Sequence, residues 1–176
     1  MPTASLLLPV SAFYDAMANA HNVARGTLTL ISTTLHHQFP TGAYLVLTRP
    51  SGDYDDDSVE LHSVRDAQGQ TVQELSPYGR GSYRLPAVPE RIGALWGDTN
   101  PRNPAEVLDL LQRIDAAFPY EFLDFLPCEL RTAEEIQAED DGGRTPLGIP
   151  LAPSVCALHG DECPARGHAE PSAPVG

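Results

Sequence analysis

The sequence predicts an α+β fold in which a long N-terminal helix packs on a short antiparallel β-meander, closed by two or three C-terminal helices and followed by a disordered tail. Apolar residues recur at helical spacing over residues 11–39, β-rich segments follow over 43–75, and two helix-start signatures lie beyond residue 100. The 176 residues suffice for one domain, and the 41% hydrophobic content is typical of a globular protein.

One apolar stripe near the start of the chain predicts the long helix. Its members are three or four residues apart and so share one helix face, which we expect to be buried. They are Phe13, Met17, Ala20, Ala24, Leu28, Ile31, Leu35 and Phe39. Ser11 is a candidate N-cap, and Pro40 with Gly42 would end the helix. Gly26 costs about 1 kcal/mol inside a helix, so two shorter helices that meet there are the alternative.

Three strands are predicted to follow as an antiparallel meander. Residues 43–49 are apolar on both alternating faces, as in a central strand. Residues 58–66 form the second strand and 71–75 the third. The connection between them is a hairpin in which Gly69 takes the positive φ.

Capping signatures and apolar spacing in the second half of the chain predict the remaining helices. A short helix is expected within 88–96, with Trp96 as a core residue. Residues 103–106 (NPAE) supply a capping Asn, a first-turn Pro and a Glu three residues on. Residues 132–135 (TAEE) form a second capping box. The apolar segment 120–126 is short, and its pattern is compatible with either a strand or a helical turn.

The folded domain is predicted to span residues 1–139 and a flexible tail residues 140–176. The tail contains six prolines and six glycines and lacks large aromatic residues. Little apolar area is therefore present to offset the entropy of ordering it.

A Cys/His cluster in the tail is a hypothetical zinc site. Cys156, His159, Cys163 and His168 have C-x2-H-x3-C-x4-H spacing, and two thiolates with two imidazoles can hold zinc tetrahedrally. The span is similar to that of a retroviral-type zinc knuckle, with a different ligand order and without the aromatic and basic residues that hold nucleotides. Such a site would be structural, because all four positions are filled. The alternative is a tail that contains these residues without binding metal.

The charge of the chain limits its partners. The net charge is −13, from 24 acidic and 11 basic residues, and all the basic residues are arginine. A lysine-free chain has no Schiff-base nucleophile and no P-loop. Its acidity opposes direct binding to nucleic acid or to an anionic membrane. The absence of lysine also suggests a GC-rich bacterial or phage genome.

Location and thiol chemistry are predicted from the ends of the chain and from the three cysteines. Residues 6–8 (LLL) have no positively charged region before them and are cut short by Pro9, so no signal peptide is expected. Three cysteines do not make a secreted disulfide framework, which favours the cytoplasm. Cys128 is predicted to be a buried structural thiol.

Other polar clusters are predicted to be structural. Residues 53–60 carry five carboxylates and form either a solvated turn or, less simply, a calcium loop that lacks the EF-hand pattern. His36 and His37 end the long helix about 100° apart, so at most one faces the core. The chain lacks the G-x-S-x-G, G-x-G-x-x-G and H-E-x-x-H motifs, which leaves no catalytic set to name.

The function we expect is a non-catalytic, cytoplasmic protein-interaction or regulatory domain with an acidic surface. Its partner would be a protein, either basic or nucleic-acid-binding, and the association would weaken with salt. One alternative is a small-molecule sensor. A helix that ends at Phe39-Pro40 and runs into a meander resembles the opening of ligand-sensing domains such as the GAF and PAS families, which implies an apolar pocket beside the sheet. A zinc-binding accessory protein is the other alternative.

Overall fold

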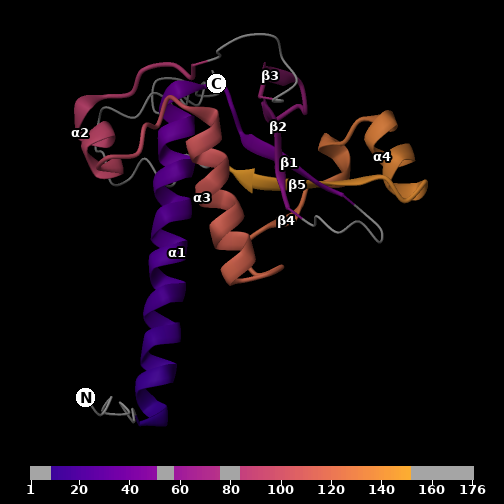
Figure 1. Cartoon of the computed structure of the whole chain (residues 1–176). Coiled ribbons are helices and arrows are strands. Elements are labelled where there is room, and N and C mark those ends of the chain that lie inside the picture. The colour runs from indigo at the N-terminus through magenta and orange to yellow at the C-terminus, as the bar shows by residue number, and fades with distance from the viewer. Residues whose placement is uncertain (1–8, 51–57, 76–83, 152–176) are drawn as a thin grey trace, which may run out of the picture.

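The computed structural model describes residues 9–50, 58–75 and 84–151 and confirms the predicted α+β fold (Figure 1). A five-stranded antiparallel sheet has the order β3-β2-β1-β5-β4. The strands are β1 (Tyr44–Pro50), β2 (Glu60–Arg65), β3 (Thr71–Glu74), β4 (Asp124–Phe125) and β5 (Arg144–Pro150). The α-helices are α1 (Val10–Gln38), α2 (Glu90–Gly93), α3 (Pro104–Ala117) and α4 (Ala133–Asp140), with single 3-10 turns at Ala94–Trp96 and Cys128–Leu130.

Helix α1 is continuous over 29 residues, so the alternative of a break at Gly26 does not occur. It begins at Val10, and Ser11 lies inside the helix instead of capping it. The threonine hydroxyls around Gly26 donate hydrogen bonds to the backbone carbonyl oxygens of residues four positions earlier in the helix. Thr27 donates to Val23 at 2.9 Å and Thr29 to Arg25 at 3.0 Å. These local bonds satisfy the hydroxyls without interrupting the helix.

The apolar stripe of α1 is buried only in its C-terminal half, which corrects the prediction that all of it would be covered. Ile31 and Leu35 are fully buried, whereas Phe13 is 61% exposed and Met17 44%. The reason is the shortness of α3, which lies beside the C-terminal half of α1 and leaves the N-terminal half projecting from the body (Figure 1). Periodicity predicts which face is apolar; how much of that face a neighbour covers depends on the tertiary structure.

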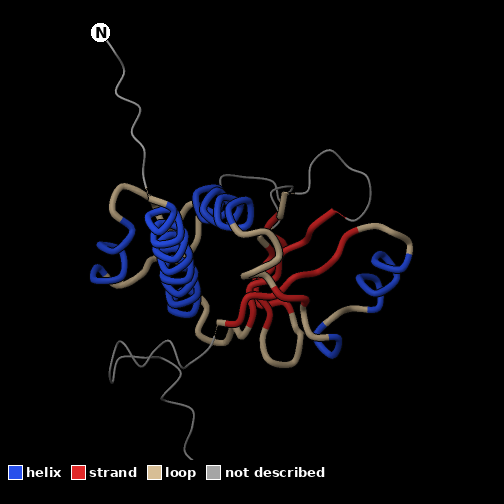
Figure 2. The backbone as a smooth tube through the Cα atoms, turned by 90° about the horizontal axis from the view of Figure 1, so that it is seen from below, coloured by secondary structure: helices blue, strands red, loops and turns tan. Residues whose placement is uncertain are grey.

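The predicted meander is confirmed, and β1 is its central strand as expected. Leu45 and Leu47 point to the helical layer, and Val46 packs on the opposite face against Leu126 and Leu130. The sheet therefore lies between α1 and α3 on one side and α4 on the other (Figure 2). Gly69 has the predicted positive φ, at 77°.

Strand β5 lies inside the segment that the sequence predicts to be tail. It pairs with β1 along seven residues and with β4 on its other side, and Leu151 just beyond it is buried. The prediction that the domain ends at residue 139 is therefore wrong, and the domain extends at least to Leu151. Leu147, Ile149 and Leu151 provide the apolar area that the composition of residues 140–176, taken as one block, conceals.

Both predicted helix-start signatures are confirmed. The Asn103 side chain accepts a hydrogen bond from the Ala105 N–H at 3.1 Å. Thr132 and Glu135 form a complete capping box at α4. Trp96 is the predicted core residue, and its indole N–H donates to the Thr34 hydroxyl at 2.9 Å. Residues 124–125 of the undecided segment form the short strand β4.

Candidate functional site

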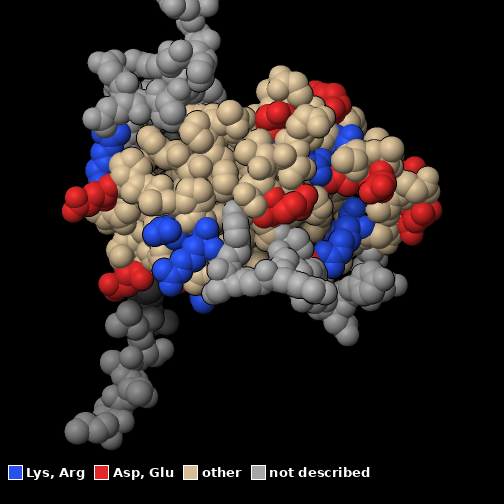
Figure 3. Space-filling view, turned by 90° about the horizontal axis from the view of Figure 1, so that it is seen from above, with Lys and Arg blue, Asp and Glu red and all other residues tan. Residues whose placement is uncertain are grey.

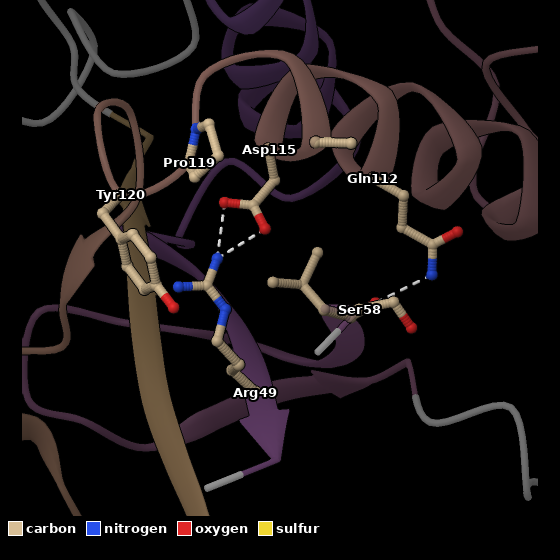
Figure 4. Close-up of a pocket in the computed structure, with 8 residues that line it drawn as sticks. Arg49, Ser58, Gln112, Asp115, Pro119 and Tyr120 are labelled. Atoms are coloured by element: carbon tan, nitrogen blue, oxygen red, sulfur yellow. Dashed lines mark hydrogen bonds and ion pairs between the residues drawn. The ribbon is translucent and has the colours of Figure 1, made fainter. Parts of the chain in front are cut away.

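A cavity of about 310 Å³ opens between the C-terminal end of α3 and the sheet (Figure 4). Its walls come from the end of β1, the segment before β2, the last turns of α3 and the residues after α3. The lining residues are Arg49, Ser58, Val59, Gln112, Asp115, Ala116, Pro119 and Tyr120. The cavity lies beside the sheet, where the sensor alternative requires a pocket, and its volume is at the lower end of the range for small-molecule sites.

Arg49 and Asp115 form a nearly buried ion pair in this cavity. Both carboxylate oxygens of Asp115 lie 2.5 Å from the Nη2 of Arg49, and the Arg49 residue is only 9% exposed. A fork-like pairing would engage Nε and Nη2 together. Here Nη2 takes both oxygens, and among the described residues none accepts a hydrogen bond from the buried Nε. Within the described residues, the Nε–H is therefore a buried donor without a partner.

Tyr120 covers the other side of the guanidinium. The centre of its ring lies 4.6 Å from the Cζ of Arg49, so the cation contacts the π face (Figure 4). Among the described residues, Tyr120 is the one residue other than glycine that has a positive φ, which is 61°. Its side chain is exposed, with 73% of the residue accessible to solvent. A left-handed conformation costs a non-glycine residue about 1 kcal/mol or more, and such residues cluster at ligand clamps.

The rest of the cavity is mainly apolar. Val59, Ala116 and Pro119 supply carbon surface, and the Gln112 amide donates to the Val59 carbonyl at 2.9 Å, which ties α3 to the sheet. One fixed ion pair, one aromatic ring and an apolar floor are suited to binding a small molecule.

A second candidate site is the uncovered part of the α1 stripe, which we term the α1 tip: Val10, Phe13, Tyr14 and Met17. All four side chains are large and exposed, and they continue the line of Ala24 and the other buried stripe residues toward the N-terminus. Exposed apolar surface of this kind marks interaction sites.

An aromatic cluster separates the α1 tip from the body. His21 of α1 packs against the rings of Phe118 and Phe122, with centroids 5.6 and 4.8 Å away. Its Nε2 lies 2.5 Å from an oxygen of Glu121. The residues that follow α3 therefore anchor α1 at His21, and the tip begins one turn before it.

On the face that Figure 3 shows, many acidic side chains lie toward the end that α4 occupies, with arginines among them, and others lie at the opposite end. Arg131 pairs with Glu139 at 2.6 Å, and Arg144 pairs with Glu60. The acidic surface expected from the composition is thus partly neutralised by ion pairs in this region.

The predicted zinc ligands Cys156, His159, Cys163 and His168 lie outside the described residues, as do residues 53–57 of the acidic turn. Within the described ranges, no three His, Cys, Asp or Glu side chains are grouped so that they could hold a metal ion. Cys128 is exposed, which corrects the prediction of a buried thiol: the 3-10 turn that contains it directs Leu130 inward instead.

The histidines at the end of α1 behave as predicted. His36 is buried and His37 is only partly so. Burial lowers the pKa of His36, and a backbone hydrogen bond at Gly42 opposes this change. Elsewhere, His62 Nδ1 lies 2.9 Å from the Ser63 hydroxyl.

Comparison with protein-family models, curated proteins and solved structures finds no match to this chain. Within the described residues, no helix is both long and apolar enough to cross a membrane. The basis for a proposal of function is therefore the geometry of the chain itself.

The sequence pattern did not predict the Arg49–Asp115 pair or its Tyr120 cover. Arg49 stands at the end of a strand and Asp115 on a helix 66 residues later. An arginine in a strand that is otherwise apolar on both faces is the one local signal, since a buried cation requires a partner.

Proposed function

We propose that this chain is a non-catalytic, cytoplasmic protein-interaction domain, and that the α1 tip binds an amphipathic helix of a basic partner protein. The observation that carries the proposal is the exposure of Phe13, Tyr14 and Met17 on a helix face whose continuation is the core. A helix from the partner would extend the packing that α3 provides further along α1.

Charge complementarity supports a basic partner. Residues 10–24 contain no arginine, and Asp15 is the one acidic residue among them. Glu121 adds a carboxylate at the base of the tip through its contact with His21. A second copy of the chain would instead bring together two net charges of −13. A partner helix would pack its apolar face on the α1 tip, and Lys or Arg residues beside that face would be attracted to the carboxylates of Asp15 and Glu121.

The test uses two synthetic peptides of about 18 residues, enough for five turns. One has leucines at helical spacing with lysines elsewhere, and the other has glutamates in place of the lysines. Fluorescence anisotropy should show binding of the Leu/Lys peptide that weakens as salt rises from about 50 to 300 mM. The Leu/Glu peptide should not bind.

Two matched variants separate binding at the tip from general attraction to an acidic protein. Met17→Glu should weaken binding of the Leu/Lys peptide about tenfold, because it places a carboxylate in the apolar contact. Val23→Glu is the control: Val23 is 61% exposed and lies about 120° around the helix from Met17. Equal effects of the two variants would refute the site. So would sedimentation of the unbound chain as a dimer that Met17→Glu dissociates, since the tip would then bind a second copy.

The hypothetical zinc site in the tail is a separate proposal. Metal analysis of the purified full-length chain should find one zinc ion per molecule if it is correct, and Cys163→Ser should remove that ion.

A further inference from the structure

We propose that the cavity between α3 and the sheet is a binding site for a small, neutral, mostly apolar molecule that carries one carbonyl-type hydrogen-bond acceptor. This site is separate from the α1 tip and goes beyond the protein-interaction function. It would make the chain responsive to a small molecule as well as to a protein partner.

The unused donor of Arg49 indicates the acceptor. Its Nε–H is buried, and no described residue accepts from it, because Asp115 places both oxygens at Nη2. A buried donor without a partner destabilises the folded chain, and more so when the group is charged. A ligand oxygen at this position would recover that loss once a neighbouring side chain of the cavity moves aside, because Nε has almost no accessible surface.

The surroundings of Arg49 favour a neutral ligand. Asp115 already neutralises the guanidinium, so an anion would meet that carboxylate within the same cavity. A cation would meet Arg49 itself and could not accept from Nε. A neutral carbonyl avoids both repulsions and still accepts the hydrogen bond.

The size and lining of the cavity define the rest of the ligand. A cavity of about 150 Å³ holds one benzene ring, and this one measures about 310 Å³. Two fused rings therefore fit. Val59, Ala116 and Pro119 would contact their faces and edges. The exposed ring of Tyr120, held by its left-handed backbone over the guanidinium, would form the outer wall (Figure 4).

Four probes of one shape test the charge preference. They are 1-indanone, which is neutral with a carbonyl, indane-1-carboxylate, 1-aminoindane and indane itself. NMR titration of the full-length chain should give 1-indanone an affinity at least about fivefold tighter than each of the others, the ratio that one extra hydrogen bond supplies. The signal of the Arg49 Nε–H should also move downfield with 1-indanone alone.

A pair of alanines on α3 provides the site control. Ala116→Leu fills the cavity from an exposed helix position and should abolish binding of 1-indanone. Ala117→Leu makes the same change at the next residue, which does not line the cavity, and should leave the affinity for 1-indanone unchanged. Equal affinity of all four probes, or binding that survives Ala116→Leu in a variant whose amide spectrum shows the native fold, would overturn the proposal. Neither result bears on the α1 tip, which the peptides test separately.

Discussion

Arg65 of β2 and Glu135 of α4 form a buried ion pair that joins the sheet to the last helix. The Arg65 Nη1 donates to one Glu135 oxygen at 2.9 Å, and its Nη2 donates to the other. Nη1 also donates to the Leu130 carbonyl at 2.8 Å. The same carboxylate accepts from the Thr132 N–H at 2.8 Å, so Glu135 completes a helix cap and an ion pair at once.

This double role predicts how stability depends on pH. Burial raises the pKa of Glu135, but the hydrogen bonds from Arg65 and Thr132 together with the nearby positive charge outweigh it, and the net pKa lies below its ordinary value of 4.5. A carboxyl with a lowered folded pKa contributes stability above its unfolded pKa, and loses it as the pH falls through the folded pKa. The wild-type chain should therefore lose unfolding free energy as the pH falls below 4.5.

Glu135→Gln should lower the unfolding free energy by about 2 kcal/mol at neutral pH, the size of a hydrogen bond to a charged group. It should also reduce the loss of stability at acid pH. Urea titrations at several pH values measure both effects, and Glu134→Gln, at an exposed position beside it, is the control. A variant that follows the wild-type pH curve would show that the ion pair adds no stability.

Two glycines should respond to alanine with opposite signs. A Cβ at Gly42 would lie 2.6 Å from the Cγ1 of Val64 and 3.1 Å from the carbonyl oxygen of Phe39. Gly42→Ala should therefore lower the unfolding free energy by about 1–3 kcal/mol. Gly26 is in the exposed middle of α1 with nothing within 4 Å, and Gly26→Ala should raise it by about 0.5–1 kcal/mol. Urea unfolding followed by the fluorescence of Trp96, the one tryptophan of the chain, gives both values. A shift of the same sign in both variants would contradict this account.

Removal of β5 should abolish folding. A chain of residues 1–139 has no partner for β1 on one edge and loses the buried Leu147 and Ile149, so it should unfold without a cooperative transition. A chain of residues 1–152 keeps β5 and should unfold cooperatively. Trp96 fluorescence in urea distinguishes the two truncated chains. Cooperative unfolding of residues 1–139 would restore the domain boundary that the composition predicts.

The elements that were predictable depend on neighbours along the chain. Helix caps at Asn103 and Thr132 and the positive φ of Gly69 are decided within a few residues, and each was predicted. The central position of β1 was also predictable, because a strand that is apolar on both faces must be covered on both.

Strand β5 was hidden by its prolines. Pro146 and Pro150 are typical of a loop, since proline cannot donate to a sheet. They are tolerated because β4 pairs only with Leu147 and Gly148, which leaves both prolines outside the part of β5 that has a strand on each side. The shortness of β4 is a tertiary fact that no local pattern contains.

The candidate cavity was unpredictable for a related reason. Arg49 and Asp115 meet because α3 crosses the end of β1, and the left-handed Tyr120 follows from how the chain leaves α3 after Pro119. The exposure of the α1 tip depends in the same way on where α3 stops. Sequence periodicity predicts where the apolar stripe lies on α1. The length of α3, which is distant in the sequence, determines how much of that stripe is buried.

The pairing of β1 with β5 also sets an order of events on the ribosome. Tyr44 pairs with Pro150, so β1 waits for about 100 further residues before its second edge is covered. At synthesis rates of roughly 5–20 residues per second, that wait lasts about 5–20 s. A nascent chain therefore presents an apolar strand with an open edge until β5 has been synthesised. The protein should depend on chaperones or on rapid elongation at this stage.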